Sequence, residues 1–267
     1  MRYMIIGGDH PRHLYYANAI AESCNVVGTI IEHRESLMPE PPEGLEERDR
    51  NNFIRHFKNR EKYEKEYFGE ERKLPNCPIH YVNRDTLSSE ETVAFVKQCA
   101  PDVVFIYGPG MIRAPLFSAF PKHKINLHLG LSPRYRGSAT LFWPFYFLEP
   151  NWSGSTFHII SDEPDAGEII HQSVPELRRG DTIHEVSCRV VQQSSEDVKK
   201  IISALERGAE PKLHRQTSSG KNFLMSDFMP QHLRVIYDLY DDALVDAFLD
   251  GKVTPKDPKP ITLSDSC

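Results

Sequence analysis

Three polar side chains have the types and the spacing that acyl transfer to an amine requires. Asn126 and His128 stand two residues apart in an apolar stretch with a strand pattern, so both side chains point to the same face. Asp165 follows in a polar loop between Pro164 and Gly167. An amide can donate a hydrogen bond to a developing oxyanion, an imidazole can handle a proton, and a carboxylate can orient or charge that imidazole. The alternative is that Asn126 and His128 only satisfy hydrogen bonds in a core.

A second histidine lies close to this group in the sequence. His158 stands in the middle of a strand pattern, between Phe157 and Ile159. Alternation along the strand places it either toward the crevice of the sheet or inside the core. Both interpretations stay open at this point.

The elements around these residues predict an α/β fold with a doubly wound, mostly parallel sheet. Strand patterns cover 3–8, 25–31, 79–82, 101–107, 125–127, 154–160 and 168–174, and helical patterns cover 13–24, 88–99, 138–148, 182–205 and 231–249. In such sheets the ligand binds in the crevice at the carboxyl ends of the strands. Gly108, Asn126 and the loop before Asp165 all stand at predicted strand ends. The pattern and the polar residues therefore indicate the same place.

Two segments lie outside this alternation. Residues 45–68 are dense in both charge signs, with Phe53 and Phe57 four residues apart, which predicts an exposed amphipathic helix. A solvated helix is favoured there over a lid or partner surface. We expect a catalytic domain over 1–207 and a C-terminal appendage over 208–267, made of a short hairpin and a helix.

Composition narrows the functional class. The chain has 267 residues and a formal net charge of −6, which disfavours nucleic acid as the main partner. The N-terminus does not show a basic stretch followed by an apolar run, so no signal peptide is predicted. The longest apolar run, 141–148, is too short to span a bilayer. Five scattered cysteines without a C-x-x-C pair fit a cytoplasmic protein. The stretch from His184 to Cys188 lacks the second histidine of a zinc-protease helix, so no metal site is expected.

Three short motifs together resemble the signature of the folate-dependent formyltransferases. They are Asn126-Leu-His128, Pro133-Arg-Tyr-Arg-Gly137 and Asp165-Ala-Gly167. That family transfers a formyl group from N10-formyltetrahydrofolate to an amine. The resemblance is strong over 102–174, loose over 2–101 and weak beyond 215. One departure is the Gly-Leu-Ser-Pro sequence at 130–133, where the family often has Ser-Leu-Leu-Pro.

The resemblance implies a Rossmann-like formyltransferase core and an N-formyltransferase activity. It implies that His128 deprotonates the attacking amine, Asn126 holds the formyl oxygen and Asp165 keeps His128 in the useful tautomer. The residues expected around N10-formyltetrahydrofolate are Tyr107, Gly108, Met111, Asp162 and Glu163, and those expected around an anionic acceptor are Arg134 and Arg136.

The class of the acceptor amine is inferred from which branch of that family the chain resembles most. Residues 7–13 do not match the phosphate loop of glycinamide ribonucleotide formyltransferases, and about sixty residues after the long helix are too few for the C-terminal barrel of methionyl-tRNA formyltransferases. The chain is most similar to the bacterial sugar N-formyltransferases, which implies a nucleotide-linked deoxyamino sugar, as in lipopolysaccharide O-antigen. Alternatives are a methionyl-tRNA formyltransferase, a formyltetrahydrofolate hydrolase and a non-catalytic ligand-binding relative. We expect no nucleic-acid or membrane partner, and a homodimer is left open.

Overall fold

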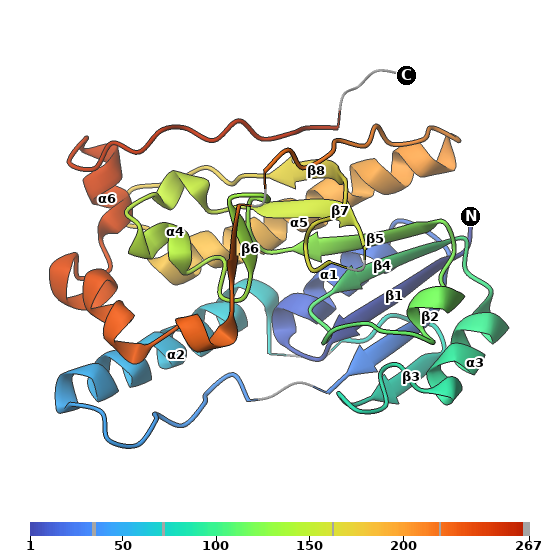
Figure 1. Cartoon of the computed structure of the whole chain (residues 1–267), viewed down its shortest axis with the longest axis horizontal. Coiled ribbons are helices and arrows are strands. Elements are labelled where there is room, and N and C mark those ends of the chain that lie inside the picture. The colour runs from blue at the N-terminus through green and yellow to red at the C-terminus, as the bar shows by residue number, and fades with distance from the viewer. Residues whose placement is uncertain (34–35, 71–72, 162, 219, 264–267) are drawn as a thin grey trace.

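A mixed sheet of seven strands forms the centre of the molecule (Figure 1). The computed structural model describes residues 1–33, 36–70, 73–161, 163–218 and 220–263. The strands are β1 (Tyr3–Gly8), β2 (Val26–Glu32), β3 (Ile79–Val82), β4 (Val103–Tyr107), β5 (His123–His128), β7 (Ser155–Ile159) and β8 (Ile169–Ser173). Their order is β3-β2-β1-β4-β5-β7-β8. The pairs from β3 to β5 are parallel, whereas β5–β7 and β7–β8 are antiparallel. The predicted doubly wound, mostly parallel sheet is confirmed.

Helices cover both faces of this sheet, because its strands are apolar on both sides. Tyr3 and Ile5 of β1 belong to the core shared with α1 (Pro11–Ala21) and α5 (Ile183–Glu206). Met4 and Ile6, which alternate with them, belong to the core shared with α3 (Glu90–Cys99). This alternation is the two-residue period of a strand buried on both faces. Among the described residues, no helix has both the length and the apolar composition needed to cross a bilayer.

The charged segment 45–68 forms the helix α2 (Glu47–Phe68) and is only partly solvated. One face is buried against α1, α5 and the C-terminal part of the chain. The buried face includes the apolar Phe53 but also polar residues, namely Asp49, Asn52, His56 and Glu64. The expected amphipathic helix is therefore present, but it is packed into the molecule rather than exposed along its length.

Two expected helices are shorter or broken. The pattern over 138–148 yields only α4 (Trp143–Tyr146), because Ala139 and Leu148 have positive φ angles of 54° and 59°. Such angles lie outside the right-handed helical region. Short 3₁₀ helices also occur: η1 (Phe117–Ala119), η2 (Pro150–Trp152) and η3 (Met225–Asp227).

The pattern over 231–249 likewise divides into three pieces. They are η4 (Pro230–His232), the π-helix η5 (Val235–Leu239) and α6 (Leu244–Leu249). Asp241 and Asp242, with φ of 46° and 61°, interrupt the chain between the last two. An aspartate can adopt this conformation more easily than most residues, but it ends the helix.

Among the described residues after 207, the expected hairpin is not present. The strand β9 (Lys221–Phe223) pairs in parallel with β6 (Tyr135–Gly137) of the motif loop. A Cβ on Gly137 would lie 2.1 Å from the carbonyl oxygen of Phe223, so only glycine allows this approach. Phe223 and Tyr237 share one core with Phe53 and Trp143. The C-terminal segment thus packs on the rest of the chain, and a boundary at 207/208 stays a prediction.

The last described residues run along the outer edge of β8, as the red segment of Figure 1 shows. The backbone N–H of Gln172 donates to the carbonyl of Ile261 at 2.7 Å, and the N–H of Leu263 donates to His171 at 3.0 Å. At the start of β8, Ile169 and His214 exchange two backbone hydrogen bonds of 2.8 Å. We call residues 254–263 the C-terminal strap.

Candidate active site

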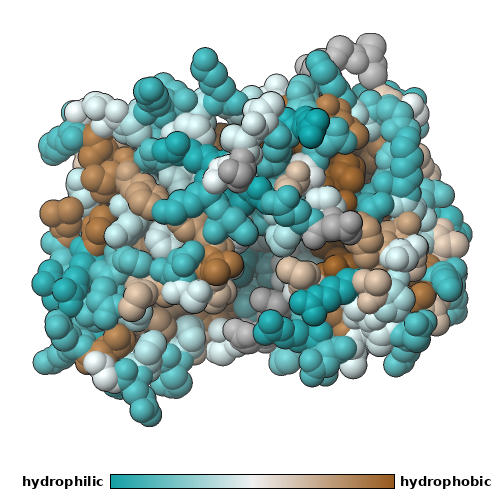
Figure 2. All heavy atoms as spheres, viewed as in Figure 1, coloured by the Kyte–Doolittle hydropathy of each residue, from teal (hydrophilic) through white to brown (hydrophobic). Residues whose placement is uncertain are grey.

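Three neighbouring strands place the polar residues side by side. Asn126 on β5 is paired with Ile106 on β4 and with His158 on β7, and His128 is paired with Thr156. These positions lie at the carboxyl end of β5. In Figure 2 this face of the molecule is hollowed near its centre, in the region where the arrowheads of β4 and β5 end in Figure 1.

Asn126 and His158 are in direct contact. Asn126 Nδ2 lies 3.1 Å from His158 Nε2, and His158 Nδ1 lies 3.0 Å from the carbonyl oxygen of Ile159. A carbonyl only accepts, so a neutral His158 carries its proton on Nδ1 and accepts from Asn126 through Nε2. One of the two N–H bonds of Asn126 is then used to orient the amide. The other is available as a donor to a ligand.

His128 is buried and contacts protein groups at both ring nitrogens. Nε2 lies 2.9 Å from the carbonyl oxygen of Tyr135, and Nδ1 lies 3.3 Å from Oδ2 of Asp165. The carbonyl fixes the proton of the neutral ring on Nε2. The lone pair of Nδ1 then faces the carboxylate, so a second proton on His128 would be stabilised at Nδ1.

Asp165 is held by a tight set of contacts. The backbone N–H of Gly137 donates to its Oδ2 at 3.0 Å, and its Oδ1 lies 3.4 Å from His158 Nε2. Gln216 Nε2 donates to the backbone carbonyls of Asp165 and Gly167, both at 2.8 Å. Asp165 itself has a φ of 51°, an uncommon conformation that these neighbours must stabilise. The carboxylate therefore bridges the two histidines.

The pKa values follow from burial and charge. Burial lowers the pKa of His128, and this effect outweighs the attraction of Asp165. Burial would raise the pKa of the Asp165 carboxyl, but the charge that His128 and His158 carry when protonated and the hydrogen bond from the Gly137 N–H hold it below its usual range. The resting site thus combines an ionised carboxylate with a neutral imidazole.

The residues expected around the donor divide into two groups. Gly108 and Met111 follow β4 directly beside Asn126, and the Met111 side chain is 59% exposed. Tyr107 is 3% exposed, and its ring packs edge-on against His13 and Tyr16, so only its backbone can reach the cleft. Glu163 is exposed, and Asp162 lies outside the described residues.

The two arginines of the motif loop do not lie free for an anionic acceptor. Arg136 is buried and donates to Glu163 Oε1 at 2.8 Å and to the carbonyl of Pro164 at 2.6 Å. Arg134 donates to both carboxylate oxygens of Glu149. Arg136 thus holds the loop that carries Asp165, whereas Arg134 faces a different part of the surface. Both expected acceptor-binding arginines are thus paired with glutamates in this structure, and their contact with an anionic acceptor stays a prediction.

Two contributors to the site could not be read from the sequence. The Tyr135 carbonyl is a backbone group without a side-chain signature, and Gln216 lies fifty-one positions beyond Asp165. His158, for which the sequence left a place at the crevice or in the core open, is 2% exposed and has a partner at each ring nitrogen, so it lies buried behind Asn126 and Asp165. Within the described residues, no group of three or more histidines, cysteines, aspartates or glutamates is arranged to hold a metal ion.

Comparison with known sequences identifies the family of this chain. The sequence profile described as formyl transferase matches residues 41–202, more than half of the chain. The chain belongs to the formyl transferase family. A methionyl-tRNA formyltransferase of Clostridium tetani is 28% identical over 131 residues, which cover 48% of this chain and 42% of that protein. The chain spans less than half the length of the curated relatives it matches.

Solved structures share the fold at low sequence identity. A sugar N-formyltransferase from Shewanella has a TM-score of 0.56 and 17% identity, covering 88% of this chain and 87% of that one. A formyltransferase from Anoxybacillus kamchatkensis has a TM-score of 0.53 and 18% identity, covering 91% of this chain and 96% of that one. It was solved with UDP-4,6-dideoxy-4-formamido-L-AltNAc and tetrahydrofolate.

Proposed function

We propose that this member of the formyl transferase family transfers a formyl group from N10-formyltetrahydrofolate to a primary amine. The observation that carries the proposal is the convergence of Asn126, His128 and Asp165 at the end of β5. The His128 Nδ1 to Asp165 Oδ2 distance of 3.3 Å and the oriented Asn126 amide support it. The site offers an oxyanion donor, a neutral base and a fixed negative charge within one cluster.

Each residue has a defined task in this reaction. The free N–H of Asn126 donates to the formyl oxygen as that oxygen gains negative charge. His128 takes the proton that the attacking nitrogen must lose, and Asp165 stabilises the resulting imidazolium at Nδ1. The Tyr135 carbonyl accepts a hydrogen bond from the other ring proton, on Nε2, and so fixes both the tautomer and the orientation of the ring. Since both nitrogens are occupied at rest, we expect a bridging water or a small ring movement to connect His128 with the amine.

The donor fits the strand end beside Asn126. When bound, N10-formyltetrahydrofolate supplies the formyl carbon that is transferred. Gly108 and Gly110 leave a half-buried backbone there, and the exposed Met111 adds an apolar contact for a planar ring. Gly108 has a φ of 81°, and a Cβ there would lie 2.3 Å from the His13 ring, so a side chain is excluded at this position. Glu163 and Arg136 would position the facing loop.

We propose a nucleotide-linked deoxyamino sugar as the acceptor. Two of the structures described above, those from Shewanella and Anoxybacillus kamchatkensis, are named for sugar formylation or hold a formamido sugar nucleotide, which supports this class. The net charge of −6 opposes long-range attraction of a tRNA. The proposed compartment is the cytoplasm, in keeping with four free thiols among the described residues.

A paired substrate screen tests the proposal. Purified protein is incubated with N10-formyltetrahydrofolate and either nucleotide 3- or 4-amino sugars or methionyl-tRNA, and formylated products are measured by mass spectrometry. We expect formylation of an amino sugar and a loss of about 10²–10³-fold in the Asn126→Ala variant, which lacks the oxyanion donor. Formylation of methionyl-tRNA alone would replace the acceptor, and release of formate without any acceptor would make the protein a hydrolase. Wild-type rates in a folded Asn126→Ala variant would remove the proposed mechanism.

A further inference from the structure

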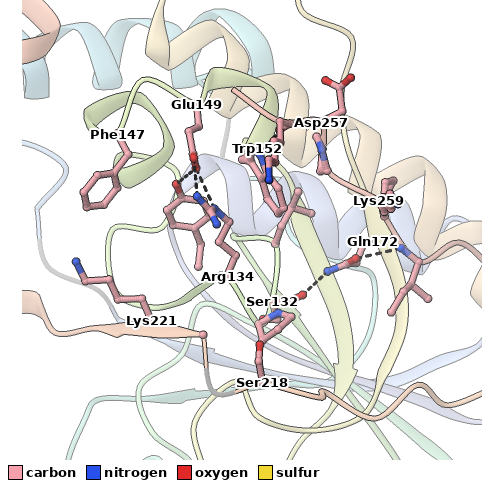
Figure 3. A pocket seen from close by; sticks show the side chains of 18 of the residues that line it. Ser132, Arg134, Phe147, Glu149, Trp152, Gln172, Ser218, Lys221, Asp257 and Lys259 are labelled. Carbon is pink, nitrogen blue, oxygen red and sulfur yellow. Dashed lines mark hydrogen bonds and ion pairs between the residues drawn. The ribbon is translucent and has the colours of Figure 1, made fainter. Parts of the chain in front are cut away.

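A second cavity lies behind the motif loop, outside the cluster of Asn126, His128 and Asp165. It has a volume of about 900 Å³ and is formed by residues 131–135, parts of 147–152 and 218–223, Gln172 and the C-terminal strap (Figure 3). None of Asn126, His128, His158 and Asp165 lines it. Its residues 218–223 and 256–261 lie beyond the part of the chain that matches the family profile. The cavity is thus formed between the family's core and this chain's C-terminal segment.

Aromatic rings form a large part of its wall. Tyr135, Phe147, Trp152 and Phe223 all line it. The Trp152 indole is fixed, because its Nε1 donates to the carbonyl of Lys256 at 2.7 Å. Phe147 is 41% exposed. Figure 3 shows Phe147 and Trp152 on the same side of the cavity, on either side of Glu149. Tyr135 and Phe223 are buried and stacked on each other, whereas Phe147 and Trp152 are partly exposed. Arg134 lies 4.8 Å from the Trp152 ring centroid, and Lys221 lies 4.9 Å from that of Phe147, so each of these two rings has one face left for a planar heterocycle.

The charge around these rings is positive, in contrast to the whole chain. Four cations line the cavity, namely Arg134, Lys221, Lys256 and Lys259, against two carboxylates, Glu149 and Asp257. Both carboxylates are already engaged: Glu149 with Arg134, and Asp257 with Asn151 at 3.0 Å. Among the described residues, none of the three lysine ammonium groups has an ion-pair partner. Lys221 lies instead 4.9 Å from the centroids of Phe147 and of Phe223.

A buried polar group adds an independent sign of a ligand. Ser132 lines the cavity, is 4% exposed, and its hydroxyl has no hydrogen-bond partner among the described residues. A buried hydroxyl without a partner costs free energy, so such groups are normally satisfied by a ligand or a water molecule. Gln172 cannot supply this bond, because its amide already joins the Ser132 carbonyl and the N–H of Ile261.

We propose that this cavity binds a nucleotide, with the base against Trp152 and Phe147 and the phosphates at Lys221, Lys256 and Lys259. An aromatic face and unpaired cations side by side are what a base joined to phosphates requires. Tyr135 connects the cavity with the candidate active site, because it lines the cavity while its carbonyl contacts His128. The site is proposed in addition to formyl transfer and does not depend on that reaction.

Binding of defined probes tests the site. The full-length protein is titrated with UDP, dTDP and ADP, with uridine as base without phosphate, and with inorganic pyrophosphate as phosphate without base. Calorimetry gives the affinity, and the change in Trp152 fluorescence reports its location. We expect a diphosphate nucleotide to bind at least about tenfold more tightly than uridine or pyrophosphate, and the affinity to fall as salt rises.

Matched variants give the decisive comparison. Lys256→Glu combined with Lys259→Glu should weaken nucleotide binding by about tenfold or more, whereas Lys252→Glu, on the same segment but outside the cavity, should not. Trp152→Phe should abolish the fluorescence change, with folding checked by thermal unfolding. His128→Ala should bind the nucleotide as tightly as the wild type. Absence of saturable binding, equal affinity for pyrophosphate and UDP, no weakening in the Lys256 and Lys259 variant, or loss of binding in His128→Ala would each overturn the proposal.

Discussion

Two buried histidine clusters of this molecule differ in the sign of the charge that faces their imidazole rings. His128 lies beside a carboxylate, that of Asp165, and a carbonyl. His56 on α2 and His184 on α5 lie against each other, with ring centroids 4.5 Å apart, and both contact the Tyr237 hydroxyl, at 3.0 Å and 3.4 Å. The facing charge at the second cluster is the cation of Arg60 rather than an anion.

This difference decides whether a buried imidazole can take up a proton. Burial, with a smaller effect of the Arg60 charge, lowers the pKa of His56 to about 3, and burial together with the charges of His56 and Arg60 holds the pKa of His184 well below its usual value. Burial also lowers the pKa of His128, but the charge of Asp165 acts against it. Burial alone therefore keeps a histidine neutral, whereas a neighbouring carboxylate lowers the free-energy cost of protonating it transiently. The first cluster suits chemistry, and the second suits packing between α2 and α5.

The largest expected effect comes from removing the first imidazole. His128→Ala should lower turnover by about 10²–10⁴-fold, because the proton of the amine loses its acceptor. His56→Gln, which removes an equally buried imidazole, should keep turnover near neutral pH within a few-fold. Initial rates of formyl transfer on proteins shown folded by circular dichroism check this. Equal losses in the two variants would erase the functional difference between the clusters.

The next effect concerns Asp165, the carboxylate that the His128 cluster has and the His56 cluster lacks. Asp165→Asn should be about as damaging as His128→Ala, because an amide cannot stabilise the imidazolium. Asp165 raises the pKa of His128, so its loss should move the acid limb of the pH–rate profile to lower pH while the plateau falls. A profile of the variant that coincides with the wild type in height and position would remove Asp165 from the mechanism.

A third prediction concerns stability rather than turnover. A histidine whose pKa is lowered in the folded state binds fewer protons there than in the unfolded chain below about pH 6.5, so stability is lost as pH falls through this range. For His56 the loss between pH 7.5 and pH 5 should be about 2 kcal/mol. His56→Gln should reduce the pH dependence of the free energy of unfolding, measured by urea titration, by this amount. His33→Gln, at an exposed histidine, is the control. Parallel curves for His56→Gln and wild type would contradict the assignment.

The smallest effect sharpens the support of Asp165. Gln216→Ala removes two hydrogen bonds to the loop carbonyls. A loss in the transition state equal to one such bond, about 0.5–1.5 kcal/mol, would lower turnover by up to about tenfold. The loss should vanish in a His128→Ala background, because Gln216 acts through the position of Asp165 opposite that ring. An equal loss in both backgrounds would make Gln216 a general stability residue.

The fold was accessible from the sequence where the apolar pattern was continuous. The strands of the sheet are apolar runs that end at glycine or polar residues, and their alternation with helices defined the parallel order. The errors fall where single residues adopt positive φ angles, such as Ala139, Asp241 and Asp242. An apolar helical pattern continues through these positions, so it cannot reveal the break.

The candidate site was accessible to a different extent. Asn126 and His128 share a face because of local strand geometry, which the sequence contains. Asp165 reaches them because β7 returns antiparallel to β5, which the motif indicated only through resemblance. The assigned roles of Asn126, His128 and Asp165 stay predictions for the experiments above. The neutralisation of Arg134 and Arg136 depends on distant glutamates, so their sequence context gave no sign of it.

The covered edge of β8 has a consequence for assembly. An open edge strand can recruit a strand from another chain, and this is a common route to dimers and to aggregates. Here His214 bonds to the edge at Ile169 and Ile261 bonds to it at Gln172. A second copy could add a strand at this side only after displacing both segments. The opposite edge, β3, is four residues long and presents the 65% exposed Tyr81. A dimer of this chain built by strand pairing would therefore use β3 unless these two segments move.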